Sequence, residues 1–102
     1  MYRILIVDDE KIERKGVSFL IKQMDVECEL TETVNGQEAL EWLEENEADI
    51  LLFGHTHIAM TDFEDGLYIM NPGSCGRPRE GGPSYGIIDI TEAGIAMHTV
   101  EL

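Results

Sequence analysis

The sequence predicts an α/β fold with a mixed sheet of about six strands, in which a β-α-β-α-β start is followed by two β-hairpins. Up to residue 53, short apolar runs alternate with segments of helical period, which is typical of parallel strands joined by crossover helices. Beyond residue 54 the helical period is absent, and two pairs of strand-like runs flank short turns. With 102 residues, we expect a single domain over 1–102.

The first half supplies the strands and helices of the crossover unit. Residues 2–7 form an almost unbroken apolar run, which predicts a strand buried on both faces. A helical spacing begins at Lys11, and the inward face of this helix is predicted to carry Ile12, Val17, Leu20 and Ile21. Apolar and polar residues then alternate over 28–34, which predicts a second strand near an edge of the sheet.

A second helix is predicted from its first turn. Asn35 is followed three residues later by Glu38, an arrangement in which the Asn side chain caps the helix N-terminus. The helix is predicted to turn four apolar side chains toward the core: Ala39, Leu40, Trp42 and Leu43. A third apolar run follows at 50–53 and ends at Gly54.

The second half reads as two hairpins separated by a loop. Residues 58–63 and 67–70 flank an Asp-Gly turn, and residues 85–90 and 95–100 flank a turn that ends at Gly94. Phe63 is expected at a core-like position. Because two helices must cover about six strands, either the hairpins form a second layer or apolar surface is buried in an oligomer. We expect a homodimer.

The charge balance restricts the classes of partner. The formal net charge is −14, so the surface repels nucleic acid and anionic membranes and favours divalent cations or basic partners. Solubility alone is the simpler explanation of this charge. The sequence has no signal-peptide pattern and no membrane-spanning run, and Cys28 and Cys75 are far apart and are expected to be free thiols. We expect a cytoplasmic protein.

Residues 1–53 resemble the receiver domain of two-component response regulators, which has a flavodoxin-like fold. The matching segments are 4–10, 35–40 and 48–52. The resemblance implies that Asp8 and Asp9 help to bind Mg²⁺ beside a phosphoaccepting Asp at the end of the third strand. Gly54 stands where that Asp belongs, so phosphorylation there is excluded because glycine has no nucleophile.

Residues 54–102 resemble the end of small metallophosphoesterases of the YfcE-like phosphodiesterase type. The matching motifs are Gly-His-Thr-His at 54–57 and Asn-Pro-Gly-Ser at 71–74. The resemblance implies that His55 and His57 are ligands of a two-metal centre that activates a hydroxide against a phosphoester. Glu10 stands where that family carries a His, and its Gly-Asp and Gly-Asn-His-Asp segments are absent. The complete catalytic ligand set is therefore not present.

A hybrid metal site is the remaining candidate. Asp8 and Asp9 end the first strand, while His55 and His57 follow the third. If these strands are neighbours in a parallel sheet, their ends meet at one edge, and the four side chains can share one divalent cation. This donor set suits Zn or another transition metal such as Mn or Ni, and the resemblance adds Mg. The alternative is that each is a solvated residue at the end of a strand.

Three hypotheses of function follow. The first is an engineered or recombinant chimera, a de novo protein without an intact native active site and hence no enzyme, whose residual chemistry is metal binding. The junction near residue 53 supports it, because 48–52 suits either family. The second is a metal-dependent phosphodiesterase, as a remnant or assembled across a dimer. The third is a degenerate receiver that acts as a binding module.

Overall fold

The computed structural model describes residues 2–24, 27–54, 59–73, 82–91 and 93–102. Two helices and seven strands follow one another in the order β1 (Tyr2–Val7), α1 (Lys11–Lys22), β2 (Cys28–Thr33), α2 (Gly36–Glu45), β3 (Ile50–Phe53), β4 (Met60–Glu64), β5 (Leu67–Asn71), β6 (Ser84–Thr91) and β7 (Gly94–Glu101). The predicted β-α-β-α-β start with two later hairpins is therefore confirmed. Neither described helix is long and apolar enough to cross a membrane.

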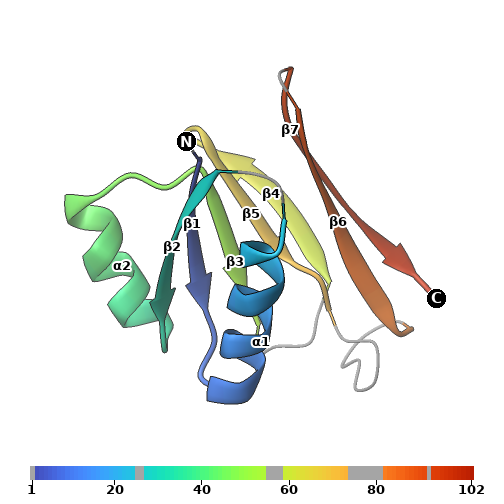
Figure 1. The fold of residues 1–102 in the computed structure, drawn as a ribbon, viewed down its shortest axis with the longest axis horizontal. Helices are drawn as coiled ribbons and strands as arrows, with labels where there is room; N and C mark the ends of the chain where they lie inside the picture. Colours follow the sequence, from blue (N-terminus) through green and yellow to red (C-terminus); the bar gives the residue numbers. More distant parts are fainter. Residues whose placement is uncertain (1, 25–26, 55–58, 74–81, 92) are drawn as a thin grey trace.

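The strands form two sheets instead of one. Five strands lie in the order β2-β1-β3-β5-β4, in which β4 alone is antiparallel to its neighbour, and β6 and β7 form a separate two-stranded sheet (Figure 1). The mixed-sheet α/β class is confirmed, with seven described strands where about six were predicted. The first hairpin joins the sheet because β5 pairs with the free edge of β3. The second hairpin stands apart because it packs by its apolar side chains and not by its edge.

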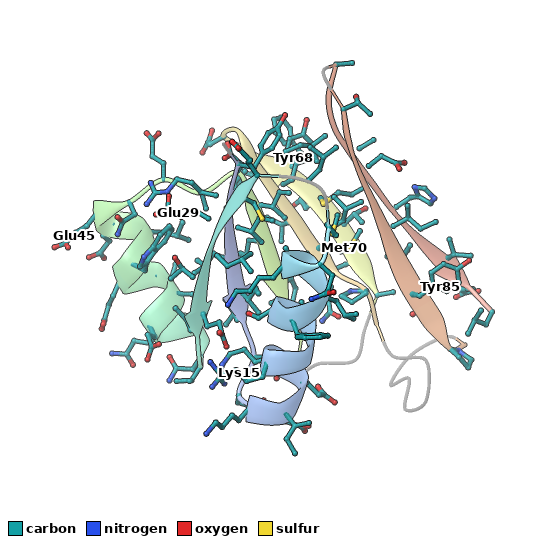
Figure 2. The ribbon with its side chains drawn as sticks, in the orientation of Figure 1. Lys15, Glu29, Glu45, Tyr68, Met70 and Tyr85 are labelled. Carbon is teal, nitrogen blue, oxygen red and sulfur yellow. The ribbon has the colours of Figure 1, made fainter. Side chains whose placement is uncertain are left out.

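One face of the five-stranded sheet carries the main core. Ile4, Ile6 and Ile50 are each at most 5% exposed, and apolar residues of α1 and of the second hairpin pack against them: Ile21, Ile88, Ile90, Ile95 and Met97. Met70 points from β5 toward the second hairpin (Figure 2). There, a Cβ on Gly86 of β6 would lie 2.6 Å from the Sδ atom of Met70. Glycine at 86 therefore lets β6 approach the sheet closely.

The opposite face is covered by α2 over β1 and β2. Leu5 is fully buried there, and Ala39 of α2 is 5% exposed. Asn35 caps this helix as predicted, because its Oδ1 accepts a hydrogen bond of 2.8 Å from the backbone N–H of Glu38.

Five expected core positions are wrong, because their side chains are exposed. The exposed fractions are 89% for Ile12, 37% for Val17, 66% for Leu20, 65% for Leu40 and 57% for Phe63. Ile12 lies in the first turn of α1, beyond the residues that reach the sheet. Leu40 lies on the side of α2 that faces β3, where no other described element packs against it. Phe63 lies on the edge strand β4 and packs against the ring of its neighbour Tyr68, with ring centroids 4.5 Å apart.

Candidate functional site

The candidate site lies at the carboxyl ends of β1 and β3. These strands are parallel neighbours, with Val7 opposite Phe53, so the adjacency on which the hybrid metal site depended is confirmed. The backbone N–H of Gly54 donates a hydrogen bond of 3.0 Å to the carbonyl of Val7. This bond fixes the two strand ends side by side, and the next residue on the β1 side is Asp8.

The surrounding backbone holds the Asp8 side chain in place. Asp8 is 8% exposed, and its Oδ1 accepts a hydrogen bond of 2.9 Å from the backbone N–H of Glu10. Its own N–H donates to the carbonyl of Thr33 at 3.1 Å, which ties the end of β1 to β2. The carboxylate is therefore oriented by the strand ends on both sides and by the turn that enters α1.

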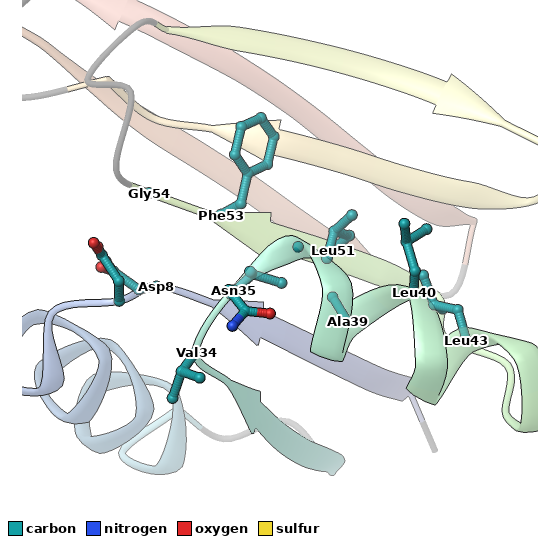
Figure 3. A pocket seen from close by; sticks show the side chains of 12 residues that line it. Asp8, Val34, Asn35, Ala39, Leu40, Leu43, Leu51, Phe53 and Gly54 are labelled. Carbon is teal, nitrogen blue, oxygen red and sulfur yellow. The ribbon is translucent and has the colours of Figure 1, made fainter.

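The second oxygen of Asp8 faces Gly54 (Figure 3). A Cβ placed on Gly54 would lie 2.6 Å from Oδ2 of Asp8, closer than ordinary van der Waals contact. Glycine at 54 thus has a steric reason as well as a chemical consequence, since it leaves the Asp8 carboxylate room at the sheet edge. In the sequence, His55 and His57 follow Gly54 by one and three residues.

The four predicted ligands have different outcomes. Asp8 is at the sheet edge and buried, while Asp9 is at the same edge and exposed. His55 and His57 lie outside the described residues. Among the residues that are described, no group of three or more His, Cys, Asp or Glu side chains is close enough to hold a metal ion. A metal site at this edge would therefore need ligands from outside the described residues, such as the two histidines.

Two polar residues at this edge were not among the four predicted ligands, although Asn71 begins the Asn-Pro-Gly-Ser motif noted in the sequence. Glu13 of α1 and Asn71 of β5 line a cavity of about 410 Å³ together with Asp8 and Gly54. Asn71 is fully buried, and its Oδ1 accepts a hydrogen bond of 3.0 Å from the backbone N–H of Gly73. The position of Asn71 at the end of an apolar run was the available signal, because β5 is parallel to β3 and ends at the same edge.

Arg14 connects Asp8 to Glu32 on the edge strand β2. Its guanidinium donates to the carbonyl oxygen of Asp8 at 2.8 Å and to the carboxylate of Glu32 at 3.1 Å. Lys15 lies 3.0 Å from the same carboxylate. The hydrogen bond from Lys15, with a smaller one from Arg14, lowers the pKa of Glu32 below its ordinary value. Arg14 and Lys15 are thus engaged with Glu32 and the backbone, and the Asp8 carboxylate faces the edge.

Comparison with known proteins assigns the family. Residues 3–93 match the family model described as the calcineurin-like phosphoesterase superfamily domain. The chain belongs to this superfamily. This family match includes residues on both sides of the junction at 53 and 54. A single phosphoesterase family therefore covers the crossover unit and most of the hairpin region. A receiver origin for residues 1–53 and a chimeric origin of the phosphoesterase chain remain predictions.

Individual relatives agree with this family. The chain is 40% identical over 45 residues to Phosphodiesterase YfcE from Escherichia coli, a match found in three strains. The match covers 43% of this chain and 24% of that phosphodiesterase, so it spans about a quarter of the relative's length. The fold resembles that of a conserved uncharacterized protein from Streptococcus pneumoniae described as a predicted phosphoesterase, with a TM-score of 0.57, 16% identity, and coverage of 97% of this chain and 88% of the other.

Proposed function

We propose that this phosphoesterase-family chain is a metal-dependent phosphodiesterase whose metal ligands are Asp8, His55 and His57, with Asp9 as a further donor. The observation that carries the proposal is the pairing of β1 with β3, which sets the Asp8 carboxylate against the residue that precedes His55. The superfamily match and the similarity to a phosphodiesterase support the reaction class.

The chemistry of the donors fits a divalent cation. Oδ1 of Asp8 bonds to the N–H of Glu10, and Oδ2 faces Gly54 at the edge, so the carboxylate is oriented before any ligand binds. Imidazole nitrogens with carboxylate oxygens suit Zn, Mn or Ni better than Mg. When bound, such a metal supplies Lewis acidity toward a phosphoryl oxygen.

Charge gives a physical reason for strict metal dependence. With a formal net charge of −14, the protein repels an anionic phosphodiester, and the Asp8 and Asp9 carboxylates add to this repulsion at the edge. A bound cation reverses the sign of the local field. We therefore expect hydrolysis only in the presence of added metal.

The test is hydrolysis of bis(p-nitrophenyl) phosphate by the metal-free protein with and without added Mn²⁺, Zn²⁺ or Ni²⁺. The proposal predicts turnover above a metal-only control, and the double variant His55→Ala/His57→Ala should reduce it to that control. The matched variant is His98→Ala, which changes an exposed histidine on β7 and should leave the rate unchanged. Equal rates for wild type and the double variant would contradict the proposal.

A chimera without catalytic function is the second candidate. The β2-β1-β3 order of the crossover unit does not separate this candidate from the first one, because a single family match spans both halves of the chain. This candidate predicts a cooperatively folded protein with no hydrolysis above the metal-only control.

A homodimer that completes the site across two copies is a further proposal, for which the same assay should show a specific activity that rises with protein concentration.

A further inference from the structure

The face of the sheet beside α2 contains an apolar groove. Two cavities of about 430 and 660 Å³ meet at Leu43, which lines both. We call this surface the α2 groove and define it by Leu40, Leu43, Leu51, Phe53 and Ile69. Figure 3 shows Leu40 and Leu43 of α2 beside Leu51 of β3. Leu51 pairs with Ile69 of β5, so the apolar floor continues across two strands.

The groove corresponds to a missing layer of the fold. A parallel sheet in an α/β protein is normally covered by helices on both faces. Here α2 packs over β1 and β2, while β3 and β5 are left without a helix on this face among the described residues. Leu40 is consequently 65% exposed, in a helix that otherwise turns its apolar side inward. The space beside α2 therefore has the position that a further helix would take.

The charge around the groove selects the kind of helix. The lining residues include six carboxylates, at Asp8, Asp9, Glu47, Asp49, Glu64 and Asp65. The basic lining residue is Arg3, whose guanidinium stacks over Trp42 at 5.2 Å and lies 3.6 Å from the Glu29 carboxylate. A second copy of the chain would bring the same acidic rim, and its net charge of −14, against the first. A basic ligand meets complementary charge instead.

We propose that the α2 groove binds a basic amphipathic α-helix of a partner protein. The apolar stripe of the helix lies on Leu51 and Ile69, beside Leu40 and Leu43. Lysine or arginine side chains that flank the stripe meet the acidic rim. This mode of recognition places residues at the helical spacing i, i+3, i+4 and i+7 in an apolar trough. This binding is separate from phosphodiester hydrolysis and needs no metal.

The test uses a fluorescein-labelled peptide of eighteen residues, made of Leu at helical spacing and Lys elsewhere, in buffer with EDTA. Anisotropy should show binding that weakens as salt is raised. The substitution Leu40→Ser should raise the Kd about tenfold, as expected for a central apolar contact. The control is Leu20→Ser on α1, an equally exposed leucine at 66% outside the groove, and it should leave the Kd unchanged. Circular dichroism checks that both variants fold.

Two further measurements decide the result independently of these variants. A scrambled peptide of the same composition should bind at least tenfold more weakly, and the intact peptide should shift the backbone amide signals of Leu43, Leu51 and Ile69 in a ¹⁵N–¹H spectrum. Equal binding of the scrambled peptide, or shifts confined to other residues, would overturn the proposal. So would a wild-type dimer in sedimentation that Leu40→Ser converts to a monomer, because a second copy would then fill the groove.

Discussion

At the scale of single residues, the contact between Gly54 and Asp8 determines what the sheet edge can do. Any side chain at 54 would push against Oδ2 of Asp8, because even a Cβ lies 2.6 Å away. The carboxylate would have to move, and with it the hydrogen bond of 2.9 Å from the N–H of Glu10. The glycine that excludes phosphoryl transfer to residue 54 therefore also leaves room for the Asp8 carboxylate, which we propose as a metal ligand.

We expect Gly54→Ala to lower the free energy of unfolding by about 1 kcal/mol, the contribution of one hydrogen bond. The control is Gly16→Ala in α1, where an added Cβ meets nothing within 4 Å and should raise the free energy of unfolding by up to about 1 kcal/mol. Urea denaturation of both variants measures the two changes. A Gly54→Ala protein as stable as wild type would show that Asp8 is not held by its surroundings.

The Glu32 carboxylate gives a prediction about pH. Because its folded-state pKa is lowered, its ion pairs stabilise the protein above the ordinary value of 4.5, and this contribution is lost as the pH falls through the lowered pKa. We expect Glu32→Gln to lower the free energy of unfolding by roughly 0.5–1 kcal/mol at neutral pH. This difference in free energy from wild type should shrink below pH 4.5.

The measurement is a set of urea titrations across this pH range. Glu29→Gln on the same strand is the matched control, because its carboxylate is 63% exposed and 3.6 Å from Arg3, and it should have little effect at any pH. If Glu32→Gln lowers the free energy of unfolding by the same amount at the lowest pH as at neutral pH, the ion pairs of Glu32 are not the cause of the loss.

Some residue roles could be read from the sequence, and others could not. The cap at Asn35 follows from a local pattern of four residues, and its hydrogen bond to Glu38 is present. The carboxylate of Asp8 was expected at the edge because a strand ends there. Glu13 and Asn71 line the same cavity, but their proximity depends on how α1 and β5 pack, which no local pattern encodes.

At the scale of elements, hydrophobic period predicted the type of every described helix and strand, but it did not predict which apolar face is covered. Leu20 and Leu40 occupy apolar positions of their helices and are 66% and 65% exposed. The hydrophobic period of a helix does not show how far that helix extends beyond the sheet on which it packs. Likewise, the second hairpin was recognisable from its turn, while its separation from the main sheet follows from tertiary packing.

The difference between covered and uncovered apolar positions can be measured with two isoleucines. Ile50 on β3 is fully buried, whereas Ile12 on α1 is 89% exposed. We expect Ile50→Ala to lower the free energy of unfolding by about 2–5 kcal/mol, since it leaves a cavity in the core. Ile12→Ala should change it by less than about 0.5 kcal/mol. Thermal or urea unfolding compares the two, and similar losses would mean that Ile12 is buried in solution.

At the scale of the whole molecule, one superfamily match spans both halves of the chain, and the sheet brings its parallel strand ends to one edge. The family match covers residues 3–93, and the strand order brings the ends of β1, β3 and β5 together there. The sequence indicated the phosphoesterase motifs at 54–57 and 71–74. It could not indicate that β5 is parallel to β3, because this pairing skips β4, the first strand of the same hairpin, which lies between them in the chain.

The proposed metal site is tested by calorimetric titration of the metal-free protein with Zn²⁺ and Mn²⁺, compared with the His55→Ala/His57→Ala double variant and with Asp8→Asn. We predict micromolar binding of about one equivalent in the wild type, lost in the double variant and weakened at least tenfold in Asp8→Asn, because the β1–β3 pairing lets these side chains share one cation. Unchanged binding in the variants, or none in a wild-type protein that melts cooperatively, would contradict a metal site at this edge.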